Sequence, residues 1–365
     1  MKILKNYSNL VLIGGLILSM PACKNDAEIP VNNVTIDLPS ELSMTYGEQQ
    51  EITLPANITG ASDVQIKLDF SATANPQLNT ASKLHDKLTR AISFDKQSGK
   101  ILINSTELYP NNTVSSVNGT NIPESYKVDV IATSSQQAFE GKQTMNIKIN
   151  RAKINIKGLD NQQEIPFAYV LYVDAANFEL EAPASISAGT TWQVENKASI
   201  GTEVSIMANQ LKFSGNAGDP DKKAEKAYDL TPVLQKDGFT IASRAFRVVF
   251  IRQIKFFYGM YYSDLDLTIL LNNLHIALSN GYLSSAPTLY PEKYKSSFSI
   301  SSIEKGRQTF DNKDGIFAID TNTGAVSVKK NNVLTEGAYK INVKATTTTG
   351  LEFTTSLTLN MSKAE

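Results

Sequence analysis

The fold is decided by the stretch ISFDKQSGKILI, residues 92–103, whose layout returns near the C-terminus as FAIDTNTGAVSV, residues 317–328. In each, an apolar residue precedes an Asp, a Gly lies four positions after that Asp, and apolar residues then alternate with others. Asp accepts hydrogen bonds from the backbone amides of a turn, and Gly adopts the positive φ that a side chain resists. The alternation sends one face of the following strand into a core. Each stretch therefore predicts a β-hairpin.

A second matched phrase follows each hairpin, YKVDVIAT at residues 126–133 and YKINVKAT at residues 339–346. Apolar residues again fall on alternate positions, and each phrase leads through a polar turn to a last strand, at 144–149 and at 353–361. Two phrases in the same order indicate an internal repeat.

Together the phrases resemble the second half of a cadherin-like repeat, with its F-x-I-D-x-x-T-G-x-[IV] turn and its Y-x-[LIV]-x-V-x-A strand. The resemblance covers about half of the chain and implies seven-stranded β-sandwiches. The C-terminal copy follows the turn pattern throughout, whereas the first copy has Ser98 in place of the Thr.

The chain departs from cadherins where calcium would bind. The family places aspartates after the Tyr strand, but here Ala132 and Ala345 are followed only by Thr and Ser. Calcium takes six to eight oxygen ligands, several of them carboxylates. We therefore expect no metal and no cofactor.

Between the first hairpin and its Tyr strand the first copy carries an insertion rich in Asn, Ser and Thr, at about 104–125, which the C-terminal copy lacks. Loops that outgrow their scaffold are frequent places for binding. A solvated surface loop without a partner is the commoner explanation of such an insertion.

The N-terminus reads as an export signal, because Lys2 and Lys5 precede a short apolar run that ends at Met20-Pro21-Ala22-Cys23. This resembles the lipobox of bacterial lipoproteins, which implies that Cys23, the only cysteine, is acylated and serves as an anchor. The charged residues 24–28 are similar to a tag that routes Bacteroidota lipoproteins outward, although a solvated linker is an equal alternative.

Length and composition predict a folded protein of two or three domains. Net charge is −1, so no basic excess indicates nucleic acid, and no second apolar segment is long enough to cross a membrane. We expect a mostly β chain of tandem immunoglobulin- or cadherin-like β-sandwiches. The expected boundaries are a signal peptide at 1–22, a tether at 23–32, a sandwich at 33–150, a β-rich middle domain at 151–263 and a second sandwich at 264–365.

Aromatic residues of the middle region are the candidates for a carbohydrate-binding face, because the C–H-rich face of a sugar stacks on a flat ring. Consecutive aromatics on a strand point to opposite faces, so some of them belong to the core. The candidate glycan-binding residues are Trp192, Tyr258, Tyr261 and Tyr262.

The segment 265–278 fits two structures. As a helix it aligns five leucines on one stripe; as a hairpin it alternates apolar residues around a turn at Asn272-Asn273. The surrounding β signals favour the hairpin.

Catalysis has no sequence signature here. The two histidines, His85 and His275, lack metal-ligand spacing, and nucleophile and phosphate-loop motifs are absent. A glycoside hydrolase remains the enzyme alternative, since it needs only two carboxylates, and Glu179 and Glu181 share one face of a strand.

The resemblance to surface glycan-binding lipoproteins of polysaccharide-utilisation systems implies a non-catalytic protein on the outer membrane, facing the exterior. It implies capture of polysaccharide or oligosaccharide near a TonB-dependent transporter, with membrane contact through the lipid anchor only. The alternative is a structural or adhesive stalk that binds a protein partner.

Overall fold

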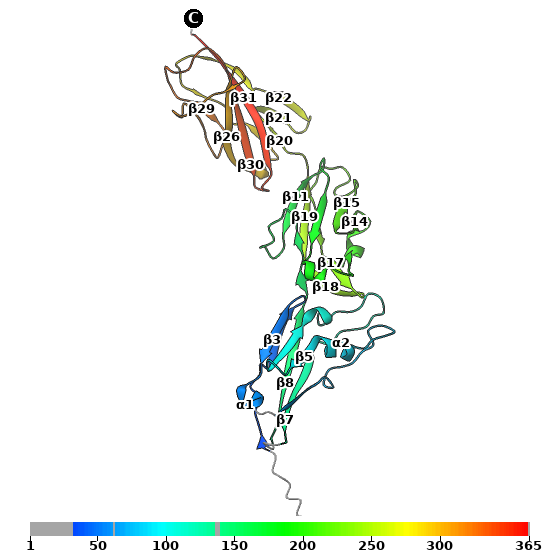
Figure 1. Cartoon of the computed structure of the whole chain (residues 1–365). Helices are drawn as coiled ribbons and strands as arrows, with labels where there is room; N and C mark the ends of the chain where they lie inside the picture. The colour runs from blue at the N-terminus through cyan, green and yellow to red at the C-terminus, as the bar shows by residue number, and fades with distance from the viewer. Residues whose placement is uncertain (1–31, 61–62, 136–138, 364–365) are drawn as a thin grey trace, which may run out of the picture.

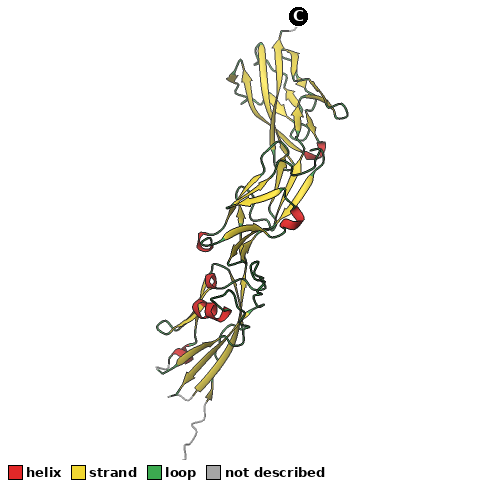
Figure 2. Cartoon of the chain, turned by 90° about the vertical axis from the view of Figure 1, so that its right-hand side faces the viewer, coloured by secondary structure: helices red, strands yellow, loops and turns green. Residues whose placement is uncertain are grey.

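The computed structural model describes residues 32–60, 63–135 and 139–363. Three β-rich domains follow one another end to end, with the first described strand at one end of an elongated molecule and the C-terminus at the other (Figure 1). Strands dominate and helices are few and short in the view turned by 90° (Figure 2). The chain is mostly β, as expected; Cys23 and the signal segment lie outside the described residues.

The first domain packs two sheets face to face. One has the order β1-β8-β7-β4 with β2 also on β8, and the other has the order β3-β6-β5. Helix α2 begins after Lys83. The backbone N–H of Lys83 donates a hydrogen bond to the Asp86 carboxylate at 2.8 Å, and the helix buries Leu84 and Leu88. The elements are β1 Asn32–Asn33, β2 Glu41–Thr45, β3 Gln49–Thr53, α1 Ala56–Thr59, β4 Gln65–Asp69, α2 Leu84–Ala91, β5 Ile92–Asp95, β6 Lys100–Asn104, the 3-10 helix η1 Ser105–Glu107, β7 Tyr126–Ser134 and β8 Phe139–Asn150.

The C-terminal domain repeats this topology. Its sheets have the orders β23-β31-β30-β26-β27 and β24-β29-β28, with two further two-stranded sheets, β20-β25 and β21-β22. The elements are β20 Lys255–Phe257, β21 Gly259–Tyr262, β22 Leu267–Leu270, β23 Asn273–Ala277, β24 Tyr282–Leu283, β25 Thr288–Tyr290, η3 Glu292–Tyr294, β26 Lys295–Lys305, β27 Gln308–Thr309, β28 Phe317–Ile319, β29 Val326–Val328, β30 Gly337–Thr347 and β31 Glu352–Ser362.

The correspondence between the two domains extends over seven strands. In each, the opening strand runs parallel to the last one, as β2 with β8 and β23 with β31. In each, the next strand pairs antiparallel with the second strand of the hairpin, as β3 with β6 and β24 with β29. The Tyr strands β7 and β30 lie between their neighbours in the same way.

Both predicted turns have the expected chemistry. Asp320 accepts hydrogen bonds from the backbone N–H groups of Asn322 and Thr323, each at 2.8 Å, and Gly324 has φ +79°. In the first copy Asp95 accepts from the N–H of Gln97 at 3.0 Å, and Gly99 has φ +67°. The repeat predicted from sequence is confirmed at these two hairpins.

The middle domain is made of three small sheets, ordered β10-β12-β15-β14, β11-β19-β16 and β13-β17-β18-β9. Its elements are β9 Ala152–Lys153, β10 Asn155–Ile156, β11 Phe167–Leu171, β12 Asn177–Glu181, η2 Ala184–Ile186, β13 Thr191–Val194, α3 Lys197–Ile200, β14 Val204–Met207, β15 Gln210–Phe213, β16 Lys226–Leu230, β17 Pro232–Lys236, β18 Phe239–Ser243 and β19 Phe246–Ile251. The β-rich character expected for 151–263 is therefore present, with β14 and β15 forming a hairpin.

The insertion of the first domain is not a free loop, because part of it packs on the middle domain. The Tyr109 ring stacks on Phe239 with centroids 4.2 Å apart, and its hydroxyl donates to Asp237 at 2.5 Å. The backbone N–H of Ser116 donates to the carbonyl of Gly238 at 2.9 Å. One continuous buried core runs through both domains, so the insertion braces the first junction.

A separate apolar cluster closes the second junction. Ile251 and Ile254, at the end of the middle domain, are buried against Leu289, Tyr294 and Phe298 of the C-terminal domain. Only three residues separate β19 from β20. The two domains are therefore joined by packed side chains as well as by a short connection.

Two sequence-based expectations need correction at this end. The segment 265–278 is neither a helix nor a hairpin: β22 pairs with β21, and β23 pairs parallel with β31. The preference for strands was right, but the partners of a strand depend on distant residues that the local pattern does not report. In addition, β20 and β21 precede the boundary expected at 264, although β20 pairs with β25 and Tyr258 lies in the C-terminal core.

Candidate binding site at the second junction

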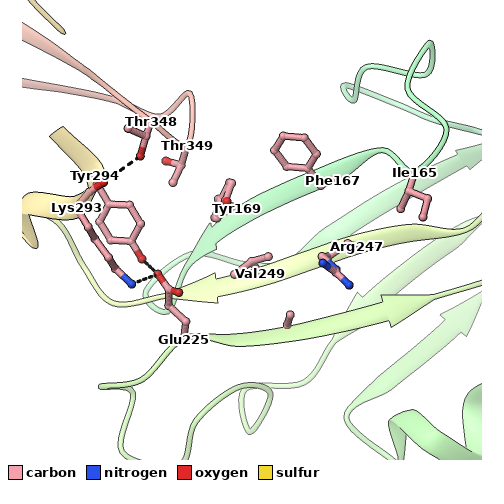
Figure 3. Close-up of a pocket in the computed structure, with 11 residues that line it drawn as sticks. Ile165, Phe167, Tyr169, Glu225, Arg247, Val249, Lys293, Tyr294, Thr348 and Thr349 are labelled. Atoms are coloured by element: carbon pink, nitrogen blue, oxygen red, sulfur yellow. Dashed lines mark hydrogen bonds and ion pairs between the residues drawn. The ribbon is translucent and has the colours of Figure 1, made fainter. Parts of the chain in front are cut away.

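A cleft lies where the middle domain meets the C-terminal domain, and its floor is the sheet β11-β19-β16 (Figure 3). Side chains alternate along β11, so Phe167 and Tyr169 point into the cleft while Val170 is buried behind them. The two rings meet edge to face with centroids 5.8 Å apart, and Phe167 is 46% exposed. This places an accessible aromatic surface at the floor of the cleft.

The neighbouring strands continue the floor with one polar row and one apolar row. Arg247 lies opposite Phe167 and is itself opposite Asp229, which it binds through two hydrogen bonds of 2.7 and 3.0 Å. Val249 lies opposite Tyr169 and Ala227. Arg247 holds the pKa of the Asp229 carboxyl below its usual range through this hydrogen-bonded ion pair.

The C-terminal domain supplies the wall. Glu225 accepts hydrogen bonds from the Tyr294 hydroxyl and forms an ion pair of 2.6 Å with Lys293. Thr348, in the turn between β30 and β31, donates its backbone N–H to the Tyr294 carbonyl at 2.9 Å. The wall is thus held to the floor by groups from both domains.

The cleft has a volume of about 630 Å³ and opens to solvent. Its two cations are each matched by a carboxylate, Arg247 by Asp229 and Lys293 by Glu225. Rings, an aliphatic patch, compensated charges and threonine hydroxyls suit a neutral ligand with one apolar face and hydroxyl groups. The lining residues are Ile165, Phe167, Tyr169, Glu225, Ala227, Arg247, Val249, Lys293, Tyr294, Thr348 and Thr349.

The aromatic residues predicted from sequence do not gather at this cleft. Tyr258 is buried, with 2% of its surface exposed, and its hydroxyl donates to the Gly324 carbonyl at 2.9 Å, so it cannot offer a sugar a stacking face. Tyr258 lies between β20 and β21, and its side chain belongs to the core of the C-terminal domain. Trp192 is half-buried against the core of the first two domains, away from the cleft lining.

Tyr261 and Tyr262 lie on β21 and point in opposite directions. The Tyr261 ring packs on Tyr290 with centroids 4.9 Å apart, and its hydroxyl donates to Asp266 at 2.7 Å. Tyr262 is 42% exposed. The structure therefore does not bring the four candidates together in one platform.

Phe167 and Tyr169 are not among the site residues predicted from sequence. The signal was their spacing of two, which puts both rings on one face of a strand. Three of the four predicted residues come instead from the denser aromatic run at 256–262. Consecutive rings on a strand cannot share a face. That Phe167 lies on an accessible face depends on which strands pair with β11.

Neither metal ligands nor spanning helices are found in the part of the chain that the structure describes. No group of three or more His, Cys, Asp or Glu side chains there could hold a metal ion. No described helix is both long and apolar enough for a membrane span. Glu179, named in the hydrolase alternative, forms an ion pair of 2.8 Å with Lys157.

No family model matches the chain, and no curated protein matches it. Solved structures similar to it include Drosophila OTK extracellular domains 3–5, at 10% identity over 92% of this chain and 99% of that one, with a TM-score of 0.32. Sidekick-1 immunoglobulin domains 1–4 are 10% identical over 90% of this chain and 75% of that one, with a TM-score of 0.29. Drosophila N-cadherin EC1–3 is 12% identical over 90% of this chain and 99% of that one, with a TM-score of 0.26. TM-scores this low carry no argument about function, so the fold stands on the strand pairing described above.

Proposed function

We propose that this protein is a rigid stalk of the cell surface, which holds a binding surface away from the membrane and contacts a protein partner there. One observation carries the proposal: both junctions between domains are closed by buried side chains and by hydrogen bonds across the boundary. Flexible linkers with few contacts are the usual boundary between domains. Packed junctions instead keep a three-domain array extended.

Small-angle X-ray scattering of the whole chain tests the rigidity. We expect the profile of a single extended conformation. Tyr109→Ala removes the stack on Phe239 and the hydrogen bond to Asp237, so it should broaden the distribution of lengths. Tyr109→Phe, which keeps the stack, is the matched control and should stay closer to wild type. A wild-type profile that requires independently moving domains would contradict the stalk.

Anchoring is part of the same proposal. Cys23 carries the lipid and fixes the chain to the outer membrane with the stalk facing the exterior. Labelled palmitate should be incorporated into the wild-type chain and not into Cys23→Ala, which should be released from the membrane fraction. Protease added to intact cells should cleave the wild-type protein; full protection would place it elsewhere.

A second candidate function is non-catalytic capture of a neutral polysaccharide, for delivery to a TonB-dependent transporter. The observation that favours it is the junction cleft, where Phe167 and Tyr169 offer ring surface beside the Arg247–Asp229 pair. Of the residues that line the cleft, Glu225 is the one carboxylate, and Tyr294 and Lys293 both engage it. A glycosidase uses two carboxyl groups, so binding without hydrolysis suits this lining better.

Gel retardation and calorimetry against neutral polysaccharides test the cleft. We expect Phe167→Ala to weaken binding at least tenfold, because the stacking ring is lost. Trp192→Ala, which lies outside the cleft, should leave binding unchanged. Gel retardation that persists in Phe167→Ala but is lost in Trp192→Ala would reject the cleft as the polysaccharide-binding site. If no polysaccharide retards the wild-type protein, polysaccharide capture is rejected and the stalk function remains.

A further inference from the structure

The hairpin formed by β21 and β22 exposes an unusual amount of apolar surface. Seven large side chains within 13 residues are between 39% and 70% exposed. Isolated exposed apolar residues are normal on proteins, but several of them gathered on one short segment indicate an interaction surface. We call this segment, residues 259–271, the apolar hairpin. Its exposed members are Met260, Tyr262, Leu265, Leu267, Ile269, Leu270 and Leu271.

One face of the apolar hairpin is held by the domain and the other is open. On the held face, Asp266 accepts hydrogen bonds from Lys255 at 2.6 Å and from Tyr261 at 2.7 Å. The open face consists of two directly opposed pairs, Met260 with Ile269 and Tyr262 with Leu267. No ionic group lies among these four.

The outer edge of β22 is also free. Among the described residues β22 pairs with β21 alone. Leu271 donates its backbone N–H to the Tyr258 carbonyl at 2.9 Å, which fixes the alternation of the antiparallel pair. Leu267 and Ile269 therefore direct their backbone groups toward β21, while Thr268 and Leu270 direct theirs outward. Four backbone groups at an exposed edge form a template for another strand.

We propose that the apolar hairpin is a homodimer contact, in which β22 of one copy pairs antiparallel with β22 of a second copy. Pairing centred on Ile269 places Thr268 of each copy opposite Leu270 of the other, so all outward backbone groups find partners. The contact is isologous, with the same patch on both sides, as a two-fold interface requires.

The same pairing brings an exposed side chain of one copy to a pocket of the other. Antiparallel pairing brings the turn of one copy, which carries Leu265, toward the base of the other copy's hairpin, where a pocket of about 210 Å³ lies. Leu265 is the most exposed of the seven, at 70%. The pocket is lined by apolar groups that include Met260, Leu271 and Leu274. A second copy thus carries the side chain that fits this hollow.

Charge and size also fit a second copy. The acidic residues of the hairpin, Asp264 and Asp266, are both at its turn, and antiparallel pairing places the two turns at opposite ends. The same acids at the tip oppose insertion into an anionic bilayer. The hairpin has 13 residues, fewer than the ~20–30 per partner of a standard interface. We therefore expect micromolar association.

Sedimentation velocity across micromolar concentrations tests the proposal, with the chain exported as Cys23→Ala so that no acyl anchor can associate. Wild type should show a monomer–dimer equilibrium. Thr268→Pro removes an outward donor and Ile269→Lys charges the open face, so each should weaken association at least tenfold. Leu265→Ala, at an exposed turn, should weaken it severalfold without any risk to folding.

Val333→Lys, an equally exposed apolar site on another loop of the same domain, should dimerise like wild type. Circular dichroism verifies that each variant is folded. A wild-type chain that stays monomeric at every concentration overturns the proposal. So does a dimer that survives all three hairpin variants, or a monomer that binds lipid vesicles and loses that binding in Ile269→Lys.

Discussion

The first and C-terminal sandwiches share seven strands in one topology, yet each carries a segment that the other lacks and that differs in its contacts. The first copy has the insertion ahead of its Tyr strand, and the insertion is covered by the middle domain. The C-terminal copy has the apolar hairpin ahead of β23, and the hairpin is exposed. The shared strands make the fold, whereas the unshared segments make contacts. An added segment that already has its partner braces the stalk, and one without a partner offers a surface.

The Tyr strands show the same contrast on a smaller scale. The Tyr339 hydroxyl donates to the carbonyl of Thr335, four residues upstream, at 3.2 Å. In the first copy the hydroxyl of Tyr126 donates instead to the carbonyl of Tyr109, within the insertion, at 2.6 Å. The same side chain thus secures a local turn in one copy and the interdomain brace in the other.

The largest expected effect separates the cores of the two copies. Phe317 is buried and meets Tyr339 at a centroid distance of 5.5 Å, so Phe317→Ala should destabilise the C-terminal domain by about 4 kcal/mol. The equivalent change, Ile92→Ala, should cost about 3 kcal/mol. Trp192 reports the joined first and middle domains. The urea midpoint of its fluorescence transition should fall in Ile92→Ala and remain at the wild-type value in Phe317→Ala. Equal shifts in the two variants would mean that all three domains unfold together.

Substitution of the turn glycines should distinguish the two hairpins. Both need a positive φ, but a Cβ at Gly324 would lie 2.7 Å from Pro287 Cγ, whereas a Cβ at Gly99 would lie 3.1 Å from Thr59 Cγ2. We expect Gly324→Ala to cost about 2 kcal/mol or more and Gly99→Ala about 1 kcal/mol. Urea unfolding followed by circular dichroism measures both. The opposite order would show that the two turns are not equivalent in packing.

Removal of the tyrosine hydroxyls should have a smaller effect. Tyr126→Phe leaves the carbonyl of the buried Tyr109 without its donor and should cost about 1.5 kcal/mol. Tyr339→Phe removes a hydrogen bond to the carbonyl of the exposed Thr335 and should cost about 1 kcal/mol. Tyr126→Phe should in addition increase amide hydrogen exchange in the insertion. Unchanged exchange there would contradict the role of Tyr126 in the brace.

The smallest effect concerns the turn aspartates. Backbone N–H groups of Thr323 and Asn322 lower the pKa of Asp320, and the Ser98 hydroxyl and Gln97 N–H lower that of Asp95. A lowered folded pKa gives stability above the unfolded value of about 4, which is lost as the pH falls through the folded value. Asp320→Ala and Asp95→Ala should lower the urea midpoint of unfolding at neutral pH. In acid, the midpoint of each variant should approach that of wild type. A constant difference would assign the effect to the turn shape alone.

The sequence alone determined the local structure of the repeat: two hairpins with Asp and Gly in fixed places, two Tyr strands and their last strands. These follow from turn chemistry and from a period of two, which are properties of neighbouring residues. The site was less predictable. Phe167 and Tyr169 could be placed on one face of a strand, but not on the floor of a cleft.

Only the tertiary structure decided which strand pairs with which, and therefore which faces are covered. Tyr258 and Tyr262 belong to the same aromatic run, yet one is buried in a core and the other is exposed. The alternation of apolar residues in 265–278 favoured strands, but the leucines of 267–271 are exposed because β22 has a single neighbour among the described strands. Whether a residue is buried depends on distant segments that pack against it, and the local sequence pattern does not specify those segments.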